Sequence, residues 1–406
     1  MTATIDRILA DPRFQAAQAE LRRGYDRFIT ELITLTEIPA PPFKEDRRAA
    51  AYLAMMRESG IEDAHLDEVG NVCGVLRGAG NAGHIAIAAH LDTVFPEGTD
   101  VTVRREGTRL FAPGVGDDTR GLATNLALLR ALRAAGIRPA RDILFVGDVG
   151  EEGKGDLRGI RHLFQAGAYR DRIDAFISVD GPQTARIVTE AVGSRRYRVT
   201  FRGPGGHSFG AFGLVNPAYA MAETLTGLSR LHLPTDPKTT ATPSVFGGGT
   251  SVNAIPDLVW FELDLRSVSA AELARIDREF RTLLGQAVAA ENARADTTKG
   301  PIRVELTAIG NRPAGATDPN AVLVNESLAA TRAFGFDPQL MASSTDANIP
   351  ISLGIPAIAI GSGADADSRA HTLEESIDIE IESMMRSQSA LLATLLAVAG
   401  MASDGA

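Results

Sequence analysis

The sequence predicts an α/β fold: a mostly parallel sheet with helices on both faces, interrupted by an inserted ferredoxin-like α+β domain. Three observations lead to this prediction. Short apolar segments alternate with amphipathic stretches over most of the chain. Between about residues 195 and 310 the elements follow a different order. The length of 406 residues is also too great for one ordinary hydrophobic core.

The N-terminal part of the chain predicts helices over residues 5–37 and 45–59. Residues 38–46 between them read IPAPPFKED. The prolines end the first helix, because proline lacks a backbone N–H and restricts the residue before it.

Buried strands and helices alternate after this pair of helices. A run of apolar residues without polar alternation is typical of a strand that is covered on both faces. The expected strands are 83–94, 141–149, 173–181 and 354–363. The expected helices are 119–137, in which Gly136 closes the helix, then 158–168, and a C-terminal helix within 380–400.

The segment 195–310 predicts the order β-α-β-β-α-β, which is typical of a ferredoxin-like unit. Strands are expected at 195–203, twice within 242–267, and at 301–310, with helices at 216–231 and 270–291. The segment separates strands that belong to one sheet. We therefore predict a main domain made of 1–194 and 311–406, with 195–310 as an insertion.

Composition and charge exclude some classes of partner. The net charge of −10 and the pI of about 5.3 disfavour nucleic acid and anionic membranes, which bind basic surfaces. The N-terminus shows no signal peptide, and no run of about 18 apolar residues is present to span a membrane. Cys73 is the single cysteine, so no internal disulfide can form, and its apolar neighbours predict a core thiol. We expect a cytoplasmic protein.

Metal-capable side chains follow the ends of the predicted strands. Active sites in open parallel sheets form at the carboxyl ends of the strands, so these side chains should meet at one edge. They are His90 and Asp92, Asp117 and Asp118 in GVGDDTRG, Glu151 and Glu152, Asp180, and His371. So many carboxylates together are electrostatically costly unless cations neutralise them.

The donor set predicts two divalent ions. Imidazoles with carboxylates and no thiolate suit zinc, manganese or cobalt. Asp117 is the expected bridge, because its glycine-flanked turn lets a short side chain enter between ions about 3.5–4 Å apart. Of Glu151 and Glu152, one should bind metal while the other acts as the base. Asp92 should hold the ligand imidazole of His90 in place.

At these residues the chain resembles the di-zinc metallopeptidase family that includes peptidase T, carboxypeptidase G, succinyl-diaminopimelate desuccinylase and the aminoacylases. The resemblance covers nearly the whole chain and is closest to peptidase T-like members. It rests on IPAPPFKE, HLDTV, GVGDDTRG, GEEGKGD, SVDG, GPGGHSFG, SVNAIPD, LDLRS, SSTDAN and AHTLEE, in this order.

The resemblance implies a zinc-exopeptidase catalytic domain and assigns each ligand. His90 and Asp180 would bind one metal, Glu152 and His371 the other, and Asp117 would bridge them. Glu151 would be the general base and Asp92 would orient His90. The peptide bond between Asp117 and Asp118 is typically cis in this family. Thr119-Arg120 departs from relatives, which often have a lysine there, and an aspartate at position 180 favours aminopeptidases and dipeptidases over carboxypeptidases.

For the insertion, the resemblance implies a lid and dimerisation domain. His207 would reach toward an active site, often that of the partner subunit, which predicts a homodimer. Asn253 and Arg266 match positions that bind substrate. Arg266 suits a substrate carboxylate, because guanidinium pairs with carboxylate in a bidentate way.

A serine hydrolase is the alternative suggested by GHSFG, which fits the nucleophile-elbow pattern around Ser208, followed by Asp346 and His371. An elbow needs a strand directly before the serine and a helix directly after it, and the residues around Ser208 predict neither. The leading hypothesis is hydrolysis of small peptides by a dipeptidase, tripeptidase or aminopeptidase. An amidohydrolase or carboxypeptidase for N-acyl amino acids and a metal-dependent binding protein remain alternatives.

Overall fold

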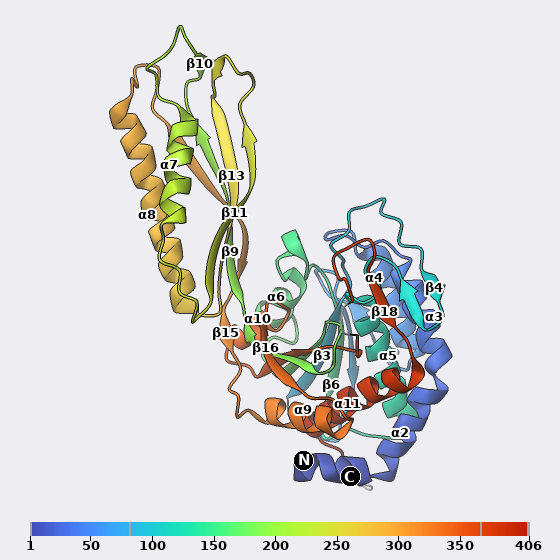
Figure 1. The fold of residues 1–406 in the computed structure, drawn as a ribbon. Helices are drawn as coiled ribbons and strands as arrows, with labels where there is room; N and C mark the ends of the chain where they lie inside the picture. The colour runs from blue at the N-terminus through green and yellow to red at the C-terminus, as the bar shows by residue number, and fades with distance from the viewer. Residues whose placement is uncertain (1, 81–82, 366–367, 404–406) are drawn as a thin grey trace. The chain divides into compact units, whose positions relative to one another are not determined.

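The computed structural model describes residues 2–80, 83–365 and 368–403. It divides into two compact units, one of Met1–Ala191 with Ala316–Ala406 and the other of Val192–Gly315, where the sequence predicted an insertion over 195–310. The predicted α/β class is confirmed, since unit 1 is built on a mixed sheet flanked by helices (Figure 1).

The N-terminal helices differ from the prediction. In place of one helix over 5–37 there are three: α1 (Ala3–Ala10), α2 (Pro12–Arg23) and α3 (Tyr25–Thr36). The first break occurs where the Asp11 carboxylate caps α2, accepting from the Arg13 N–H at 2.8 Å, with Pro12 in the first turn. Gly24 separates α2 from α3. Helix α4 (Asp46–Glu58) lies where it was predicted.

The four predicted strands form the parallel centre of the unit 1 sheet. They are β6 (Ile143–Asp148), β3 (His84–His90), β7 (Ile173–Val179) and β17 (Ala357–Ile360), adjacent in this order. The sheet continues antiparallel on one side with β2 (Val72–Leu76) and β1 (His65–Leu66), and on the other with β8 (Arg186–Ala191), beyond which lies β15 (Gly315–Ala316). Cys73 is buried in β2, as predicted.

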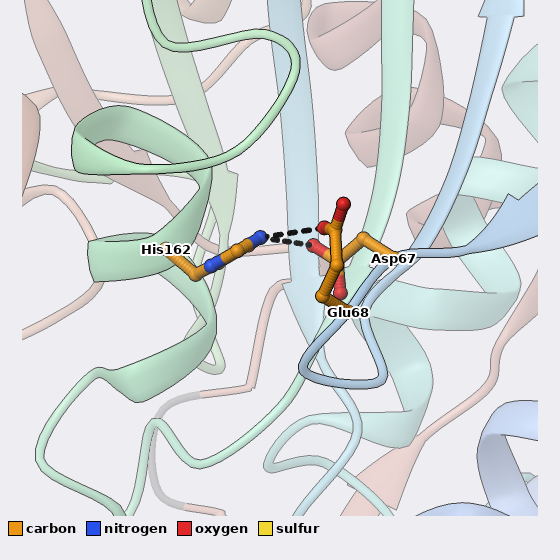
Figure 2. Close-up of side chains that lie close together, drawn as sticks. All are labelled: Asp67, Glu68 and His162. Carbon is orange, nitrogen blue, oxygen red and sulfur yellow. Dashed lines mark hydrogen bonds and ion pairs between the residues drawn. The ribbon is translucent and has the colours of Figure 1, made fainter.

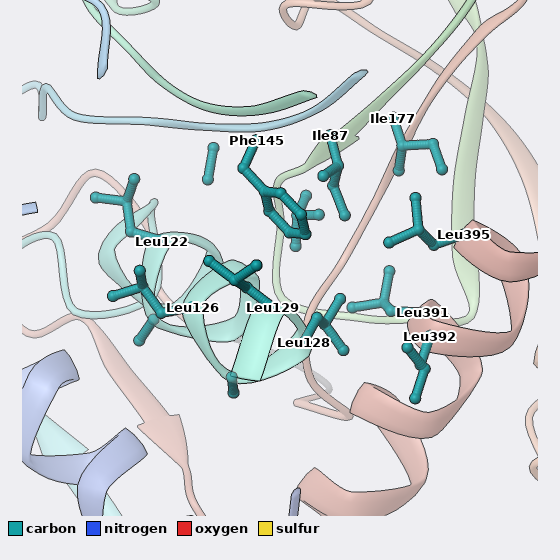
Figure 3. Close-up of a cluster of buried hydrophobic side chains, with 14 of the residues drawn as sticks. Ile87, Leu122, Leu126, Leu128, Leu129, Phe145, Ile177, Leu391, Leu392 and Leu395 are labelled. Atoms are coloured by element: carbon teal, nitrogen blue, oxygen red, sulfur yellow. The ribbon is translucent and has the colours of Figure 1, made fainter. Parts of the chain in front are cut away.

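Side chains of β3 divide between two cores, which explains its continuous apolar run. Ile85 and Ile87 enter the larger core, whereas Ala86 and Ala88 enter the smaller one. Figure 3 shows the larger core, where leucines of α5 (Thr119–Ala134) and α11 (Ile381–Ala399) lie near Phe145, Ile87 and Ile177. The smaller core receives Leu163 and Phe164 of α6 (Arg158–Gln165).

Several elements of unit 1 were not predicted. They include β8 and its neighbour β16 (Gln339–Ser343), α9 (Val322–Ala333), α10 (Asn348–Ser352), and a small sheet of β4 (Arg104–Glu106), β5 (Arg109–Phe111) and β18 (Ser376–Asp378). The side chains of β16 are exposed or half-buried, so this strand lacks the apolar run on which the prediction relied.

Unit 2 has the order β-α-β-β-α-β: β9 (Gly193–Arg202), α7 (Pro217–Ser229), β11 (Thr239–Gly248), β13 (Leu258–Ser267), α8 (Ala270–Arg294) and β14 (Arg303–Arg312). The four strands are antiparallel in the order β11-β13-β9-β14. A separate two-stranded ladder joins β10 (Gly206–His207) to β12 (Ala254–Ile255).

Within residues 2–80, 83–365 and 368–403, no helix has both the length and the apolar character that a membrane span needs.

Candidate active site

The predicted ligands of unit 1 lie after strand ends at one edge of the sheet. His90 is the last residue of β3, Glu151 and Glu152 follow β6, and Asp180 follows β7. Asp117 lies in the turn before α5. Parallel strands place their carboxyl ends at the same edge, so topology alone brings these segments together.

Asp117 lies between two histidines. Its Oδ1 is 3.0 Å from Nε2 of His90, and its Oδ2 is 3.1 Å from Nε2 of His371. Nε2 of His371 also lies 2.8 Å from Oε1 of Glu152. Each carboxylate oxygen of Asp117 therefore faces a different imidazole, and ligand atoms of His90, Asp117 and Glu152 all lie within 4.8 Å of one another.

The two histidines differ in their surroundings. The His90 side chain is 1% exposed, whereas that of His371 is 54% exposed. Hydrogen bonds with Asp117 and Glu152 outweigh burial and raise the pKa of His371 to about 11. Burial alone would lower the pKa of His90, but the hydrogen bond to Asp117 and the charges of Asp118, Asp117 and Asp92 raise it well above its usual range. Both imidazoles thus lie in a strongly negative field.

Asp92 contacts two parts of the predicted site. Nδ1 of His90 lies 3.0 Å from the backbone carbonyl oxygen of Asp92, and 3.7 Å from the carboxylate oxygen Oδ1. The carboxylate instead accepts hydrogen bonds from the backbone N–H groups of Glu151 and Glu152, each at 2.9 Å. Asp92 therefore connects the end of β3 to the loop that carries both glutamates.

Carboxylates crowd the remainder of the site. Burial, followed by the charge of Asp117, raises the pKa of Asp180 to about 8. Asp118 is fully buried, and its Oδ2 accepts the backbone N–H of His90 at 3.0 Å while its Oδ1 has no hydrogen-bond donor. A set of two imidazoles and several oxygen ligands, with a buried carboxylate oxygen lacking a donor, fits divalent cations of the zinc, manganese or cobalt type.

Two further carboxyl groups near the site were not recognised as part of it from sequence. Asp148, at the end of β6, and Asp346 are fully buried, and their two carboxyl groups face each other and share a hydrogen bond. Burial, together with the charge of the neighbouring carboxylates, raises the pKa of Asp148 to about 7 and that of Asp346 well above its usual range. The position of Asp148 at a strand end, like that of His90, was the available sequence signal.

Unit 2 carries the other predicted site residues. Nδ1 of the exposed His207 accepts the backbone N–H groups of Phe209 and Gly210, both at 3.2 Å. Asn253 is also exposed, and its carbonyl oxygen accepts the N–H of Ser208 at 2.9 Å. Arg266 lies on β13, where its Nε donates to Oδ2 of Asp264 at 2.8 Å.

A second His–carboxylate group, Asp67, Glu68 and His162, is shown in Figure 2. Nε2 of His162 lies 2.8 Å from Oε2 of Glu68, whose side chain is 75% exposed. Oδ1 of Asp67 accepts three backbone N–H groups, and its Oδ2 accepts Nδ2 of Asn71. The contacts are those of a tight turn joined to a surface ion pair.

Residues 86–397 match the protein family described as peptidase family M20/M25/M40. This match spans most of the chain. The chain belongs to this family. The resemblance inferred from the sequence motifs is therefore confirmed.

Three solved structures show the same fold. Aminopeptidase PepT from Bacillus cereus is 21% identical with a TM-score of 0.74, covering 92% of this chain and 99% of that chain. A tripeptidase from Staphylococcus aureus is 21% identical with a TM-score of 0.75 and the same coverage. The di-peptidase Dug1p from Saccharomyces cerevisiae is 15% identical with a TM-score of 0.73, covering 95% and 98%.

A local sequence match links the M20 chain to a Pyrococcus furiosus protein described as a LysW-lysine/LysW-ornithine hydrolase. The two are 37% identical over 119 residues. The match spans 29% of this chain and about a third of the relative, 32%.

The structure of this M20 chain also bears on the expected cis peptide bond and on the serine-hydrolase alternative. The peptide bond between Asp117 and Asp118 is cis, as the resemblance implied. The serine-hydrolase alternative lacks its Asp–His contact, because His371 pairs with Asp117 and Glu152 whereas Asp346 lies with Asp148.

Proposed function

We propose that this chain hydrolyses an amide bond in small peptides with the help of two divalent metal ions, most suitably zinc. The observation that carries the proposal is the position of Asp117, whose two carboxylate oxygens each face a different histidine. A bridging carboxylate needs this arrangement to serve two ions at once. His90 and Asp180 would hold one ion, Glu152 and His371 the other, and manganese or cobalt would suit the same donors.

Glu151 is the proposed general base. When bound, the two ions acidify the attacking water and polarise the amide carbonyl. The Glu151 carboxylate takes the proton from that water and later gives it to the leaving amine. Glu151 is only 5% exposed, and the backbone N–H of Glu151 donates a hydrogen bond to the Asp92 carboxylate at 2.9 Å. The base thus has little freedom to leave its position.

His207 is the proposed donor to the oxygen that becomes negative during attack. Because its Nδ1 accepts two backbone N–H groups, the neutral ring carries its proton on Nε2. An Nε2–H donor is the tautomer that an oxyanion requires.

Arg266 and His207 lie at opposite ends of unit 2, which supports a homodimer. Arg266 pairs with Ser194, close to the residue at which the chain enters this unit. His207 pairs with Ala254, beyond the other end of β13. From Leu258 to Arg266 the strand covers about 27 Å at roughly 3.4 Å per residue. We propose that Arg266 binds the substrate carboxylate and that His207 serves the partner subunit's site.

Mixing two impaired variants tests this assignment of His207. Glu151→Gln and His207→Ala should each have strongly reduced activity alone, and exchange of subunits should raise the activity of the mixture. A heterodimer then contains one site with an intact base and an intact donor from the partner. Absence of recovery, with subunit exchange demonstrated, would place His207 in its own subunit's site or outside the reaction.

The solved relatives named above are described as an aminopeptidase, a tripeptidase and a di-peptidase, which supports a small-peptide substrate. The alternative is an amidohydrolase for N-acyl amino acids, which would use the same residues with a different pocket. Zinc-loaded protein should therefore be assayed against free, N-blocked and C-blocked dipeptides and tripeptides. Cleavage of free peptides only would favour the peptidase, and cleavage of N-acylated substrates would favour the alternative.

A further inference from the structure

Glu375 is a fully buried carboxylate that contacts the turn carrying Asp117. Its Oε2 accepts the backbone N–H of Gly114 at 3.0 Å. Its Oε1 accepts those of Gly116 and Asp117, at 2.7 Å and 2.8 Å. One carboxylate thus binds three N–H groups of the turn that presents Asp117 to the two histidines.

The turn is shaped to admit this carboxylate. A Cβ atom added at Gly116 would lie 3.1 Å from Oε1 of Glu375 and 2.9 Å from a methyl group of Ile377. Gly114 has φ of +78°, a conformation that disfavours residues with side chains. The two glycines of GVGDD therefore allow the backbone to approach Glu375 closely.

Glu375 also belongs to the segment that carries His371. Its backbone N–H donates to the carbonyl oxygen of Thr372 at 3.1 Å, and its carbonyl oxygen accepts the N–H of Ala112 at 3.1 Å. The side chain and the main chain of Glu375 thus fasten this segment to both ends of residues 112–117. Asp117 and His371, which face each other, are joined through it.

A second buried carboxylate, Asp365, connects the same two parts of the chain. Nη1 of Arg120 donates to Oδ2 of Asp365, and Nε of Arg120 donates to Ser362 Oγ at 3.0 Å. Oδ1 of Asp365 accepts the N–H of Asp378 at 2.6 Å. The arginine that departs from the family pattern is therefore part of the same set of connections.

Three hydrogen bonds to backbone N–H groups offset part of the cost of burying the Glu375 carboxylate. Its location still places negative charge next to Asp117, which is unfavourable for the isolated chain. The repulsion between the Glu375 and Asp117 carboxylates is unfavourable, and it weakens when the neighbouring ligands bind cations. This connects Glu375 to metal binding more closely than to turn stability alone.

We propose that Glu375 is a positioning residue that holds the Asp117 turn against the His371 segment, so that both ligands are set for the paired metal ions. This role rests on the proposed function, because it presumes that Asp117 and His371 bind metal. Replacing a residue that orients a metal ligand without touching the ion typically lowers metal affinity by about 10–100-fold.

The test compares Glu375→Gln with wild type and with Glu374→Gln. Glu374 is the adjacent residue, its side chain is 70% exposed, and it pairs with Arg369, so the control makes the same change in charge away from the turn. Zinc affinity and stoichiometry are measured by calorimetry, and the absorption spectrum of the cobalt-loaded protein reports ligand geometry. Thermal unfolding and steady-state kinetics at saturating zinc complete the set.

Wild type and Glu374→Gln should bind two ions per chain with the same cobalt spectrum. Glu375→Gln should bind its weaker ion about 10–100-fold less tightly, with an altered spectrum and a lower kcat at nearly unchanged KM. If Glu375→Gln does not fold, Glu375→Asp keeps the charge but shortens the reach, and the same changes are expected.

Unchanged zinc affinity and an unchanged cobalt spectrum in the folded variant would overturn the role of Glu375, even if its thermal stability fell. Failure of wild type itself to bind two ions would instead overturn the proposed function.

Discussion

The predicted site residues of the two units have opposite environments. In unit 1, His90, Asp92 and Glu151 are buried. The backbone N–H of His90 is hydrogen-bonded to Asp118, and Asp92 is hydrogen-bonded to the ring of His90 and to the backbone N–H of Glu151. In unit 2, His207 and Asn253 are exposed and lie on or beside a ladder of only two-residue strands. Bond-breaking chemistry requires groups fixed to within a fraction of an ångström, whereas groups that receive substrate must first let it enter. In the proposed mechanism, the fixed catalytic groups would therefore belong to unit 1 and the substrate-receiving groups to unit 2.

Metal removal should have the largest effect, because the buried residues of unit 1 are proposed to bind two cations. Dialysis against a strong chelator is expected to abolish hydrolysis, and adding zinc, manganese or cobalt should restore it. A serine-directed phosphonate should have no effect. Persistent activity in protein shown to be metal-free would refute the metal-dependent reaction.

Glu151→Gln should give the next largest effect. It removes the proposed base while keeping its shape, so kcat should fall by about 10²–10⁴-fold. Metal content should remain that of wild type. Glu58→Gln is a suitable control, since this side chain is 71% exposed. Near-normal kcat in the Glu151 variant would assign the base elsewhere.

His207→Ala tests whether an exposed residue of unit 2 takes part in the reaction. Loss of a single oxyanion donor should raise the barrier by about 2.7–4 kcal/mol, with zinc content unaffected. His232→Ala, another exposed histidine of unit 2, serves as the control. If both variants have wild-type kcat, His207 has no part in the mechanism.

Arg266→Ala should mainly affect substrate binding. A lost charge-assisted hydrogen bond to a substrate carboxylate is worth about 1.5–3 kcal/mol, which should appear in kcat/KM. Peptides with an amidated C-terminus should show little difference between this variant and wild type. An equal loss for both kinds of peptide would contradict the proposed carboxylate contact.

The pH dependence of stability sharpens the comparison for unit 1 alone. In the metal-free chain the pKa of Asp180 is raised to about 8, so folding favours its protonated form, and this contribution is lost as pH rises through that value. The pKa of His371 is raised to about 11, so its stabilisation is complete below its unfolded pKa and also declines as pH rises. Both groups therefore stabilise the folded state less as pH rises. The Tm of metal-free protein should fall from about pH 5 to 9, whereas the Tm of a zinc-loaded sample should change less. If the Tm of the metal-free protein rose over this pH range, the raised pKa values of Asp180 and His371 would be contradicted.

The sequence alone determined the α/β class and the edge at which the metal-capable residues gather. Apolar runs in β3, β6, β7 and β17 reflect burial on both faces, a property that each strand carries locally. Once the strands are parallel, residues such as His90 and Asp180 must lie at one edge, whatever the packing details.

Only the tertiary structure decided which side chains meet there. In the folded chain, the two carboxylate oxygens of Asp117 face two different histidines. The Asp92 carboxylate accepts hydrogen bonds from the backbone of Glu151 and Glu152, and Asp148 is buried against Asp346. The tertiary structure also joined Glu375 to the N–H of Asp117, 258 residues away in the sequence. Periodicity is set by neighbours along the chain, but a hydrogen bond between distant segments depends on how whole elements pack.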